Sequence, residues 1–263
     1  AWVLFDKDYA TSKNAYVLNV GDAGGAFNVT VDGMTYFNQW SLVNETISTF
    51  VDLDIASNGD MFLITGPDNN IWRYFGGVWE RVAVGITGDI IRVSPAYDTD
   101  KAVMYALKDS TNAIRISTNN ANSFTPQPAA PGSTYPSSAN AISTLLVLGA
   151  NSVVVGSTGG VITTSTNGYY WPEVTVTGLG DVQSLAVDPV SGDILAGSAS
   201  TGAGKVALST DNGITWSVAT QTIAGIDATG PMIVAFGYSY ATTGEMYATG
   251  QNAGTDAGVW KRT

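Results

Sequence analysis

Short stretches with one pattern recur along the 263-residue chain, and each ends in an aromatic residue. The fullest copy reads STDNGITW, from Ser209 to Trp216, and related copies read TVDGMTY, YFGGVW, STNNANSF and STNGYYW. Successive closing aromatics stand 43, 45, 47 and 45 residues apart. Such regular spacing indicates one structural unit of about 45 residues that is used several times. The closing aromatics are Tyr36, Trp79, Phe124, Trp171 and Trp216.

The residues between these stretches predict what the unit is. One period holds three short runs rich in β-branched and aromatic residues, Ile90–Val93, Ala102–Leu107 and Ala113–Ile116, separated by Gly, Asn, Asp, Ser and Pro. No window has the sustained i, i+3, i+4, i+7 pattern of a helix. A period of about 45 residues with four strands is typical of propeller blades. We therefore predict an all-β fold, a β-propeller of about six four-stranded blades with almost no helix.

The sixth repeat ends early. Its strands are predicted at Met232–Phe236, Glu245–Thr249 and Gly258–Thr263, and the sequence stops where the next turn would begin. We predict a single domain, 1–263, whose last blade lacks its outer strand, with seven blades in a longer parent chain as the alternative. An open strand edge is normally covered. We expect the edge near Val259–Arg262 to pair with residues outside 232–263, from an upstream segment or a neighbouring subunit; the alternative is a solvent-exposed edge blunted by Lys261 and Arg262.

The full copy, Ser-x-Asp-x-Gly-x-Thr-Trp, resembles the Asp-box, or bacterial neuraminidase repeat. That repeat occurs in sialidases, sortilin-type receptors, xyloglucanases, the photosystem II assembly factor family and microbial surface proteins. The resemblance implies a turn between the third and fourth strands of a blade, where Asp211 accepts backbone N–H bonds and Trp216 packs between sheets. The residues that carry it are Ser209, Asp211, Gly213, Thr215, Trp216, Ser165, Asn167, Gly168, Trp171, Ser117, Asn119, Phe124, Asp32, Gly33 and Tyr36. We interpret them as structural rather than catalytic.

Composition excludes several classes of function. The formal net charge is −11, and the 11 Lys and Arg residues are scattered singly, which disfavours nucleic acid as a partner. No apolar run approaches the roughly 18 residues that a membrane span needs. The chain has no Cys and no His, which excludes disulfides, Cys/His zinc sites and Ser-His-Asp triads. An acidic, hydroxyl-rich chain of this kind favours an extracellular or cell-surface location.

Carboxylates, Tyr, Lys and Arg are the remaining candidates for catalysis. Asp52 and Asp54 alternate with apolar residues in a predicted first strand and could form the pair that glycoside hydrolysis requires. We favour solvated or turn-bonded acids instead. The acids of the YDTDK and DPVSGD stretches are predicted hairpin-turn residues that could ligate calcium. We expect no cofactor otherwise. Sialidase chemistry is disfavoured, because none of the five arginines stands in the Arg-Ile-Pro context of that family.

Two further features concern glycans. Tyr169 and Tyr170 lie in a predicted turn and could stack on sugars, whereas closing aromatics are more often core residues. Asn28 and Asn44 each fit the N-glycosylation triplet. Taken together, the sequence predicts a non-catalytic structural or interaction module of a secreted or cell-surface assembly, such as a surface layer or filament, with other protein subunits as partners. The alternative is a carbohydrate-binding or glycoside-hydrolase-like propeller.

Overall fold

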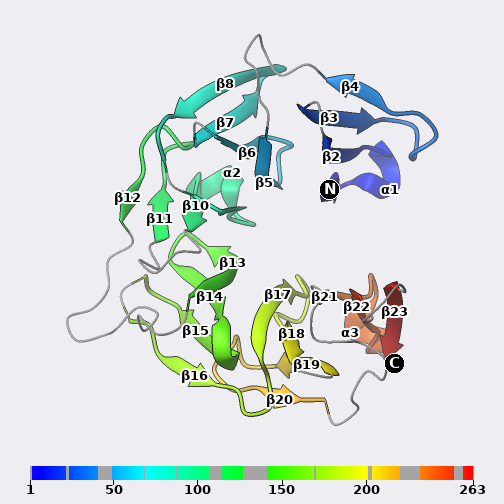
Figure 1. Cartoon of the computed structure of the whole chain (residues 1–263), viewed down its shortest axis with the longest axis vertical. Coiled ribbons are helices and arrows are strands. Elements are labelled where there is room, and N and C mark those ends of the chain that lie inside the picture. The colour runs from blue at the N-terminus through cyan, green and yellow to red at the C-terminus, as the bar shows by residue number, and fades with distance from the viewer. Residues whose placement is uncertain are drawn as a thin grey trace. The chain divides into compact units, whose positions relative to one another are not determined.

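The computed structural model describes residues 2–21, 24–40, 49–67, 69–86, 88–106, 114–126, 141–168, 170–200, 203–219, 232–251 and 257–262. Within these ranges the chain forms six antiparallel sheets, in which consecutive strands pair with their neighbours in chain order. We number the sheets 1 to 6 along the chain (Figure 1). By packing, the chain divides into two compact units. Sheets 1–3 lie in the first unit and sheets 5 and 6 in the second; sheet 4 belongs to the second except for the end of its first strand.

Sheets 1 to 3 each have four strands. The first strands of sheets 2 and 3 pack against the preceding sheet, β5 against sheet 1 and β9 against β5 and β6. The strands are β1 (Trp2–Phe5), β2 (Ala15–Gly21), β3 (Gly24–Thr30) and β4 (Asn38–Trp40) in sheet 1; β5 (Thr49–Ile55), β6 (Met61–Gly66), β7 (Asn70–Phe75) and β8 (Val78–Ala83) in sheet 2; and β9 (Ile90–Val93), β10 (Val103–Ala106), β11 (Ile114–Ser117) and β12 (Thr125–Pro126) in sheet 3.

Sheets 4 and 5 also have four strands, and sheet 6 has three among the described residues. The first strands of sheets 5 and 6 again pack on the preceding sheet, β17 on β14 and β21 on β17 and β18. The strands are β13 (Ile142–Gly149), β14 (Ser152–Ser157), β15 (Val161–Ser165) and β16 (Glu173–Thr175) in sheet 4; β17 (Asp181–Val187), β18 (Ile194–Ser200), β19 (Ala203–Ser209) and β20 (Ser217–Val218) in sheet 5; and β21 (Ile233–Phe236), β22 (Met246–Gln251) and β23 (Ala257–Arg262) in sheet 6.

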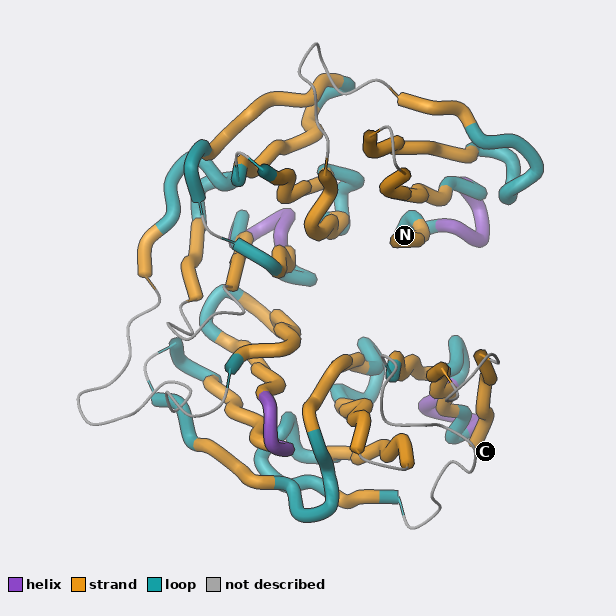
Figure 2. The backbone as a smooth tube through the Cα atoms, viewed as in Figure 1, coloured by secondary structure: helices purple, strands orange, loops and turns teal. Residues whose placement is uncertain are grey.

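In the described parts of the chain, helix is confined to single turns, which confirms the predicted all-β class (Figure 2). Three four-residue helices, α1 (Tyr9–Ser12), α2 (Tyr97–Asp100) and α3 (Tyr240–Thr243), each connect the first and second strands of a sheet, and a 3-10 turn, η1, spans Thr158–Gly160. The YDTDK stretch therefore forms a helical turn rather than the simple hairpin turn that we predicted. Among the described residues, no helix has the length and hydropathy that crossing a membrane requires.

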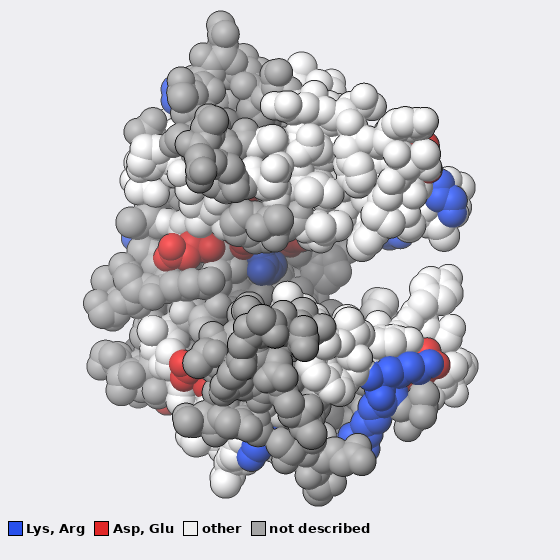
Figure 3. Space-filling view, turned by 45° about the vertical axis from the view of Figure 1, so that its right-hand side comes forward, with Lys and Arg blue, Asp and Glu red and all other residues white. Residues whose placement is uncertain are grey.

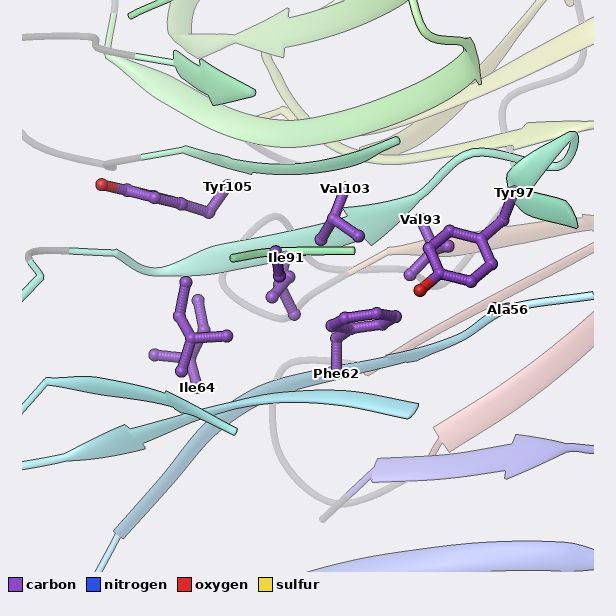
Figure 4. Packing of buried hydrophobic residues seen from close by; sticks show 10 residues of the cluster. Ala56, Phe62, Ile64, Ile91, Val93, Tyr97, Val103 and Tyr105 are labelled. Atoms are coloured by element: carbon purple, nitrogen blue, oxygen red, sulfur yellow. The ribbon is translucent and has the colours of Figure 1, made fainter. Parts of the chain in front are cut away.

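The core lies between the sheets of each unit. In the first unit, the inward side chains of sheet 2 face those of sheet 3 (Figure 4). A second cluster joins sheets 1 and 2, and there Phe27 and Trp79 pack edge to face with ring centroids 5.5 Å apart. In the second unit, Leu195 of sheet 5 packs with Met232 and Val234 beside sheet 6. Alternate side chains of every strand point to one face of its sheet. Each sheet therefore needs a neighbouring sheet to bury its apolar face.

Candidate functional site

The turn of the fullest repeat is held by its own side chains. The Asp211 Oδ1 atom accepts hydrogen bonds from the backbone N–H groups of Ile214 and Thr215, at 3.1 and 2.8 Å. The Ser209 Oγ atom donates to Asp211 Oδ1 at 2.8 Å and accepts the Gly213 N–H at 2.8 Å. Gly213 has φ +84°, a conformation that side chains disfavour. These bonds satisfy the turn internally.

The same network recurs in three other loops; we call residues 30–37, 117–124, 165–171 and 209–216 the box loops. Ser117 Oγ accepts the Ala121 N–H at 2.9 Å, and Asn119 Oδ1 accepts the Ser123 N–H at 3.1 Å. In the third loop Asn167 Oδ1 accepts the Tyr170 N–H at 2.9 Å. The carbonyl oxygen of an Asn side chain thus occupies the place of the Asp211 carboxylate in two loops.

The first box loop corrects the alignment predicted from the sequence. Thr30 Oγ1 accepts the Met34 N–H at 3.1 Å, so Met34, with φ +70°, stands where Gly213 stands. Asp32 Oδ1 accepts the N–H groups of Thr35 and Tyr36 at 3.0 and 3.1 Å. This frame puts Phe37, not Tyr36, at the position of the closing aromatic. Tyr36 is 74% exposed and packs in no core cluster of the described residues.

The closing aromatics differ in burial. Trp79 and Trp171 are buried, whereas Phe124 and Trp216 are only partly buried. The Trp216 indole Nε1–H donates to the Gly213 carbonyl oxygen at 3.1 Å, so the ring folds back over its own turn. The expectation that Trp216 packs fully between sheets is therefore too strong. The YFGGVW copy forms a plain hairpin turn through Gly76 and Gly77, both with positive φ.

Two box loops also bind the preceding sheet. The Thr164 hydroxyl on β15 of sheet 4 donates to the Gly213 carbonyl oxygen at 3.1 Å. The Arg73 guanidinium on β7 of sheet 2 donates to the Asn120 carbonyl oxygen at 2.5 Å and to Glu80 at 3.0 Å. In both cases a third strand reaches the box loop of the next sheet. The box loops thus fasten sheets to one another as well as closing their own hairpins.

The Asp52 and Asp54 carboxylates bind the first strand of the next sheet. The Ile91 backbone N–H donates to Asp52 Oδ2 at 2.9 Å, and the Val93 N–H donates to Asp54 Oδ2 at 2.8 Å. The Arg92 guanidinium forms an ion pair with Asp52 at 2.5 Å. Our interpretation of these acids as solvated or turn-bonded was wrong. Because β9 pairs with β10 on one edge only, its outward N–H groups need acceptors, and the two carboxylates supply them.

Sheet 5 binds the start of sheet 6 at the equivalent position of its first strand, through uncharged side chains. The Ser184 hydroxyl donates to the Met232 carbonyl oxygen at 2.8 Å and accepts the Val234 N–H at 3.1 Å. The side-chain oxygen of Gln183 accepts the Met232 N–H at 2.5 Å. No pattern in the repeats pointed to these bonds. The available signal was a polar residue within an otherwise apolar first strand, which is costly unless it has a partner.

The pKa values of the box-loop carboxylates are shifted in the opposite direction from that of Asp54 in the first strand of sheet 2. The Thr215 hydroxyl, with the turn N–H groups, lowers the pKa of Asp211 below its ordinary value, and the Thr30 hydroxyl does the same for Asp32. Burial raises the pKa of Asp54, although Arg92 and the Val93 N–H oppose that effect. Hydrogen-bond donors favour the ionised form, whereas desolvation favours the neutral one.

The other predicted sites are separated from one another. Tyr170 is 61% exposed, and Tyr169 lies outside the described residues, as does Asn44. Asn28 lies within β3, where its side-chain amide donates to Asn19 at 3.1 Å. Across the described parts of the chain, no group of three or more acidic residues is arranged to hold a metal ion.

The acids named as possible calcium ligands have hydrogen-bond partners within the protein. Asp98 accepts the Ser57 hydroxyl at 3.0 Å, Asp100 accepts the Ser94 hydroxyl at 2.5 Å, and Asp188 accepts the Ser191 N–H at 2.7 Å. Asp193 accepts the Tyr240 hydroxyl at 2.8 Å. Each bond lies within a loop or between neighbouring sheets, so these acids are part of the framework. Figure 3 shows one face of the molecule, most of whose described atoms belong to uncharged residues.

Strand β23 has a paired edge and an edge without a partner strand among the described residues. It pairs with β22 from Ala257 to Arg262, and within the described ranges no strand pairs with its other side. The backbone bonds that we expected to residues outside 232–263 are not found among the described residues. Val259 is exposed on this strand, and the Lys261 ammonium binds Glu245 at 2.5 Å.

Comparison with solved structures identifies the architecture. A structure described as YCF48 bound to D1 peptide matches with a TM-score of 0.60 and 13% identity, over 94% of this chain and 78% of that one. The fold is a β-propeller. The six sheets are its blades, as the repeats predicted.

A second propeller, YCF48 from Cyanidioschyzon merolae, matches with a TM-score of 0.50 and 14% identity, over 74% of this chain and 63% of that one. This chain thus corresponds to less than two thirds of the length of the second propeller. No family model and no curated protein matches the sequence. At these sequence identities, the structural similarity establishes the fold alone.

Proposed function

We propose that this propeller is a non-catalytic interaction module that binds an extended segment of a partner protein along the open edge of β23. The proposal rests on that edge, because this six-residue strand is paired on one side only among the described residues. Unpaired N–H and C=O groups in a row are a template for a further strand. A partner segment that adds to the sheet gains main-chain hydrogen bonds along its length.

Two further observations support a protein partner. The similar solved propeller is described as YCF48 bound to D1 peptide, so a propeller of this architecture binds a peptide of another protein. The most prominent carboxylate pair, Asp52 and Asp54, accepts backbone N–H bonds from Ile91 and Val93. Those oxygen atoms serve the packing of two sheets, which favours a structural use over acid–base chemistry on a sugar.

We further propose that the partner belongs to a secreted or cell-surface assembly, of the surface-layer or filament kind. Support comes from the composition, with net charge −11 and no Cys. Protease treatment of intact source cells, followed by immunoblotting, tests the location. Cleavage of this chain while a cytoplasmic marker survives is the expected result, and protection equal to that of the marker contradicts it.

Amide hydrogen exchange tests the binding site. Exchange is measured by mass spectrometry on the native assembly purified from its source and on the isolated chain. Segment 257–262 should exchange more slowly in the assembly, whereas the box loop 209–216 should exchange equally in both. Equal exchange of segment 257–262 in the two samples contradicts β-strand addition at this edge.

Carbohydrate binding is the second candidate, and the exposure of Tyr170 favours it. An exposed tyrosine ring in a turn is a suitable platform for a sugar face. A glycan array probed with the parent chain and with Tyr170→Ala decides the matter. Binding that the substitution abolishes would establish a glycan site, and an array without signal would remove this candidate.

A further inference from the structure

Three asparagines are directly followed by glycine, namely Asn58, Asn167 and Asn212. In such a pair the backbone nitrogen of the glycine can attack the side-chain carbonyl carbon of the asparagine, because glycine has no Cβ to hinder the approach. The reaction releases ammonia and leads to aspartate or isoaspartate. Since the three pairs have the same chemistry, the contacts around each pair decide which of them reacts.

In the box loops, the nitrogen of this glycine is fixed in place. The Gly213 N–H donates to the Ser209 Oγ atom at 2.8 Å. In the same way, the Gly168 N–H donates to the Ser165 Oγ atom at 3.0 Å. Gly213 also packs on the preceding sheet, since a Cβ built on it would lie 2.6 Å from Thr164 Oγ1, and the Thr164 hydroxyl donates to its carbonyl oxygen. Movement of this glycine toward the preceding side chain would therefore break one bond within the loop and another between sheets 4 and 5.

The third pair lies in the hairpin turn between β5 and β6, where the glycine has fewer contacts. Among the described residues, no atom beyond its chain neighbours lies within 4 Å of a Cβ built on Gly59. The Gly59 N–H donates to the Ala56 carbonyl oxygen at 3.0 Å, a bond within the turn itself. The turn is bound to the next sheet through an exposed side chain, because the Ser57 hydroxyl donates to Asp98 Oδ2 at 3.0 Å. A turn whose backbone is not bound to a neighbouring sheet opens locally more readily.

The Asn58 side chain is also placed for attack. It is exposed, and its Oδ1 atom accepts the Asp60 N–H at 3.0 Å. A hydrogen bond to this oxygen stabilises the negative charge that develops on it when the carbonyl carbon is attacked. The Asn167 Oδ1 atom has a similar donor in the Tyr170 N–H, so these two sites differ chiefly at the nitrogen of the glycine.

We propose that Asn58 is the one of these three asparagines that deamidates in the native chain, and that the box loops protect Asn167 and Asn212. The Gly59 nitrogen forms a bond to the side-chain carbonyl carbon of Asn58, and the amide nitrogen leaves as ammonia with the proton of the Gly59 N–H. Water then opens the cyclic imide at either carbonyl group and leaves a carboxylate at position 58. The reaction needs no oxidant or reductant, and the proposal is independent of partner binding at β23.

The product changes the contacts between sheets 2 and 3. The Asn58 Nδ2 atom donates to Asp60 Oδ2 at 3.0 Å, and deamidation replaces this donor by a second carboxylate. Burial, and then the Asp60 carboxylate, raises the pKa of Tyr97, whose ring packs on Phe62 of sheet 2 (Figure 4). Two carboxylates this close repel one another. Deamidation should therefore loosen the junction of sheets 2 and 3.

Peptide mapping of the native chain tests the proposal. The chain is kept in mildly alkaline buffer, digested and analysed by mass spectrometry, with isoaspartate detected by enzymatic methylation. The peptide with Asn58 should deamidate several-fold faster than the peptides with Asn167 and Asn212, whereas the three should react at similar rates in urea. Equal rates at Asn58 and either box-loop asparagine in the native chain overturn the proposal, and so does an unchanged order of rates in urea.

Removal of the protecting hydroxyl gives a second test. In Ser209→Ala the Gly213 N–H loses its acceptor, so Asn212 should deamidate faster while the rate at Asn58 stays the same. Thr210→Ala is the matched control, since Thr210 is exposed in the same loop. Circular dichroism verifies that the variants are folded before the rates are compared. An unchanged rate at Asn212 in folded Ser209→Ala contradicts protection by the box loop.

The effect on the junction is tested separately with Asn58→Asp, which copies one product of the reaction. This variant should unfold at a lower urea concentration than the parent chain. Asn119→Asp is the matched control, because Ser117 and Ser123 both donate to the side-chain oxygen of Asn119 and can donate equally to a carboxylate. An unfolding midpoint of Asn58→Asp equal to that of the parent chain contradicts a loosened junction.

Discussion

At two junctions, that of sheets 2 and 3 and that of sheets 5 and 6, side chains of one sheet bind the backbone of the next sheet's first strand. The two junctions do so with different chemical groups. Asp52 and Ser184 occupy the same register position, each just after a bulge in a first strand. Each accepts one backbone N–H from the equivalent residue of the next first strand, Ile91 or Val234. The first junction adds an ion pair with Arg92, and the second uses neutral groups throughout.

The difference shows that charge is not needed to fasten one blade to the next. A serine hydroxyl both donates and accepts, so Ser184 satisfies a carbonyl and an N–H at once. An ionised aspartate only accepts, and its charge in a buried place requires a cation such as Arg92. The acidic pair in this first strand thus serves the packing of one sheet on the next.

The charged junction should respond most strongly to substitution. Asp52→Ala leaves the Ile91 N–H without an acceptor and Arg92 without its ion-pair partner, so we expect the free energy of unfolding to fall by about 3–5 kcal/mol. Urea unfolding followed by fluorescence measures the change. Asp8→Ala removes an exposed acid and serves as the control. A loss as small as that of the control would mean that the Asp52 contacts contribute nothing to folding.

The neutral junction should respond less. Ser184→Ala removes one donor and one acceptor but no charge, and we expect a loss of about 1–3 kcal/mol. Ser217→Ala, at an exposed position of β20, provides the control under the same urea unfolding. A loss that exceeds that of Asp52→Ala would reverse the order that we derive from the two junctions.

A box-loop glycine offers a third test of the contact between sheets. In Gly213→Ala the new Cβ would lie 2.6 Å from Thr164 Oγ1, at a residue with φ +84°, so we expect about 2 kcal/mol of destabilisation. Gly192→Ala has a similar φ but a nearest contact of 3.4 Å, which isolates the backbone cost of about 1 kcal/mol. Equal losses in the two variants would show that contact with sheet 4 adds nothing.

The repeats predicted the sheets but not the bonds between them. Strand positions such as Ile90–Val93 could be predicted because side-chain alternation and turn residues are local. The donors to Asp52 and Asp54 could not, because a backbone N–H has no sequence signature and each of these lies 39 residues away. The frame of the first box loop was missed by one residue, since Tyr36 and Phe37 are adjacent aromatics and only the hydrogen bonds distinguish them.

Carboxyl titration should distinguish the pKa of a box-loop carboxylate from that of a carboxylate at the junction of sheets 2 and 3. Relative to the ordinary value of 3.8, the pKa of Asp211 is lowered and that of Asp54 is raised. Asp211 therefore stabilises the fold above pH 3.8, and its contribution is lost as the pH falls through its lower folded pKa. Ionisation of Asp54 opposes folding above its raised pKa, so its protonation at lower pH favours the folded state. Carbon-detected NMR titration measures both, and the reverse order of the two pKa values contradicts this assignment.

Amide exchange at Ile91 and Val93 tests most directly whether side chains of one blade satisfy the first strand of the next. Both amides should exchange slowly in the parent chain under native conditions. Under conditions where Asp52→Ala remains folded, the Ile91 amide should exchange much faster, while the Val93 amide, bound by Asp54, keeps more of its protection. Unchanged protection of the Ile91 amide in Asp52→Ala would contradict the account.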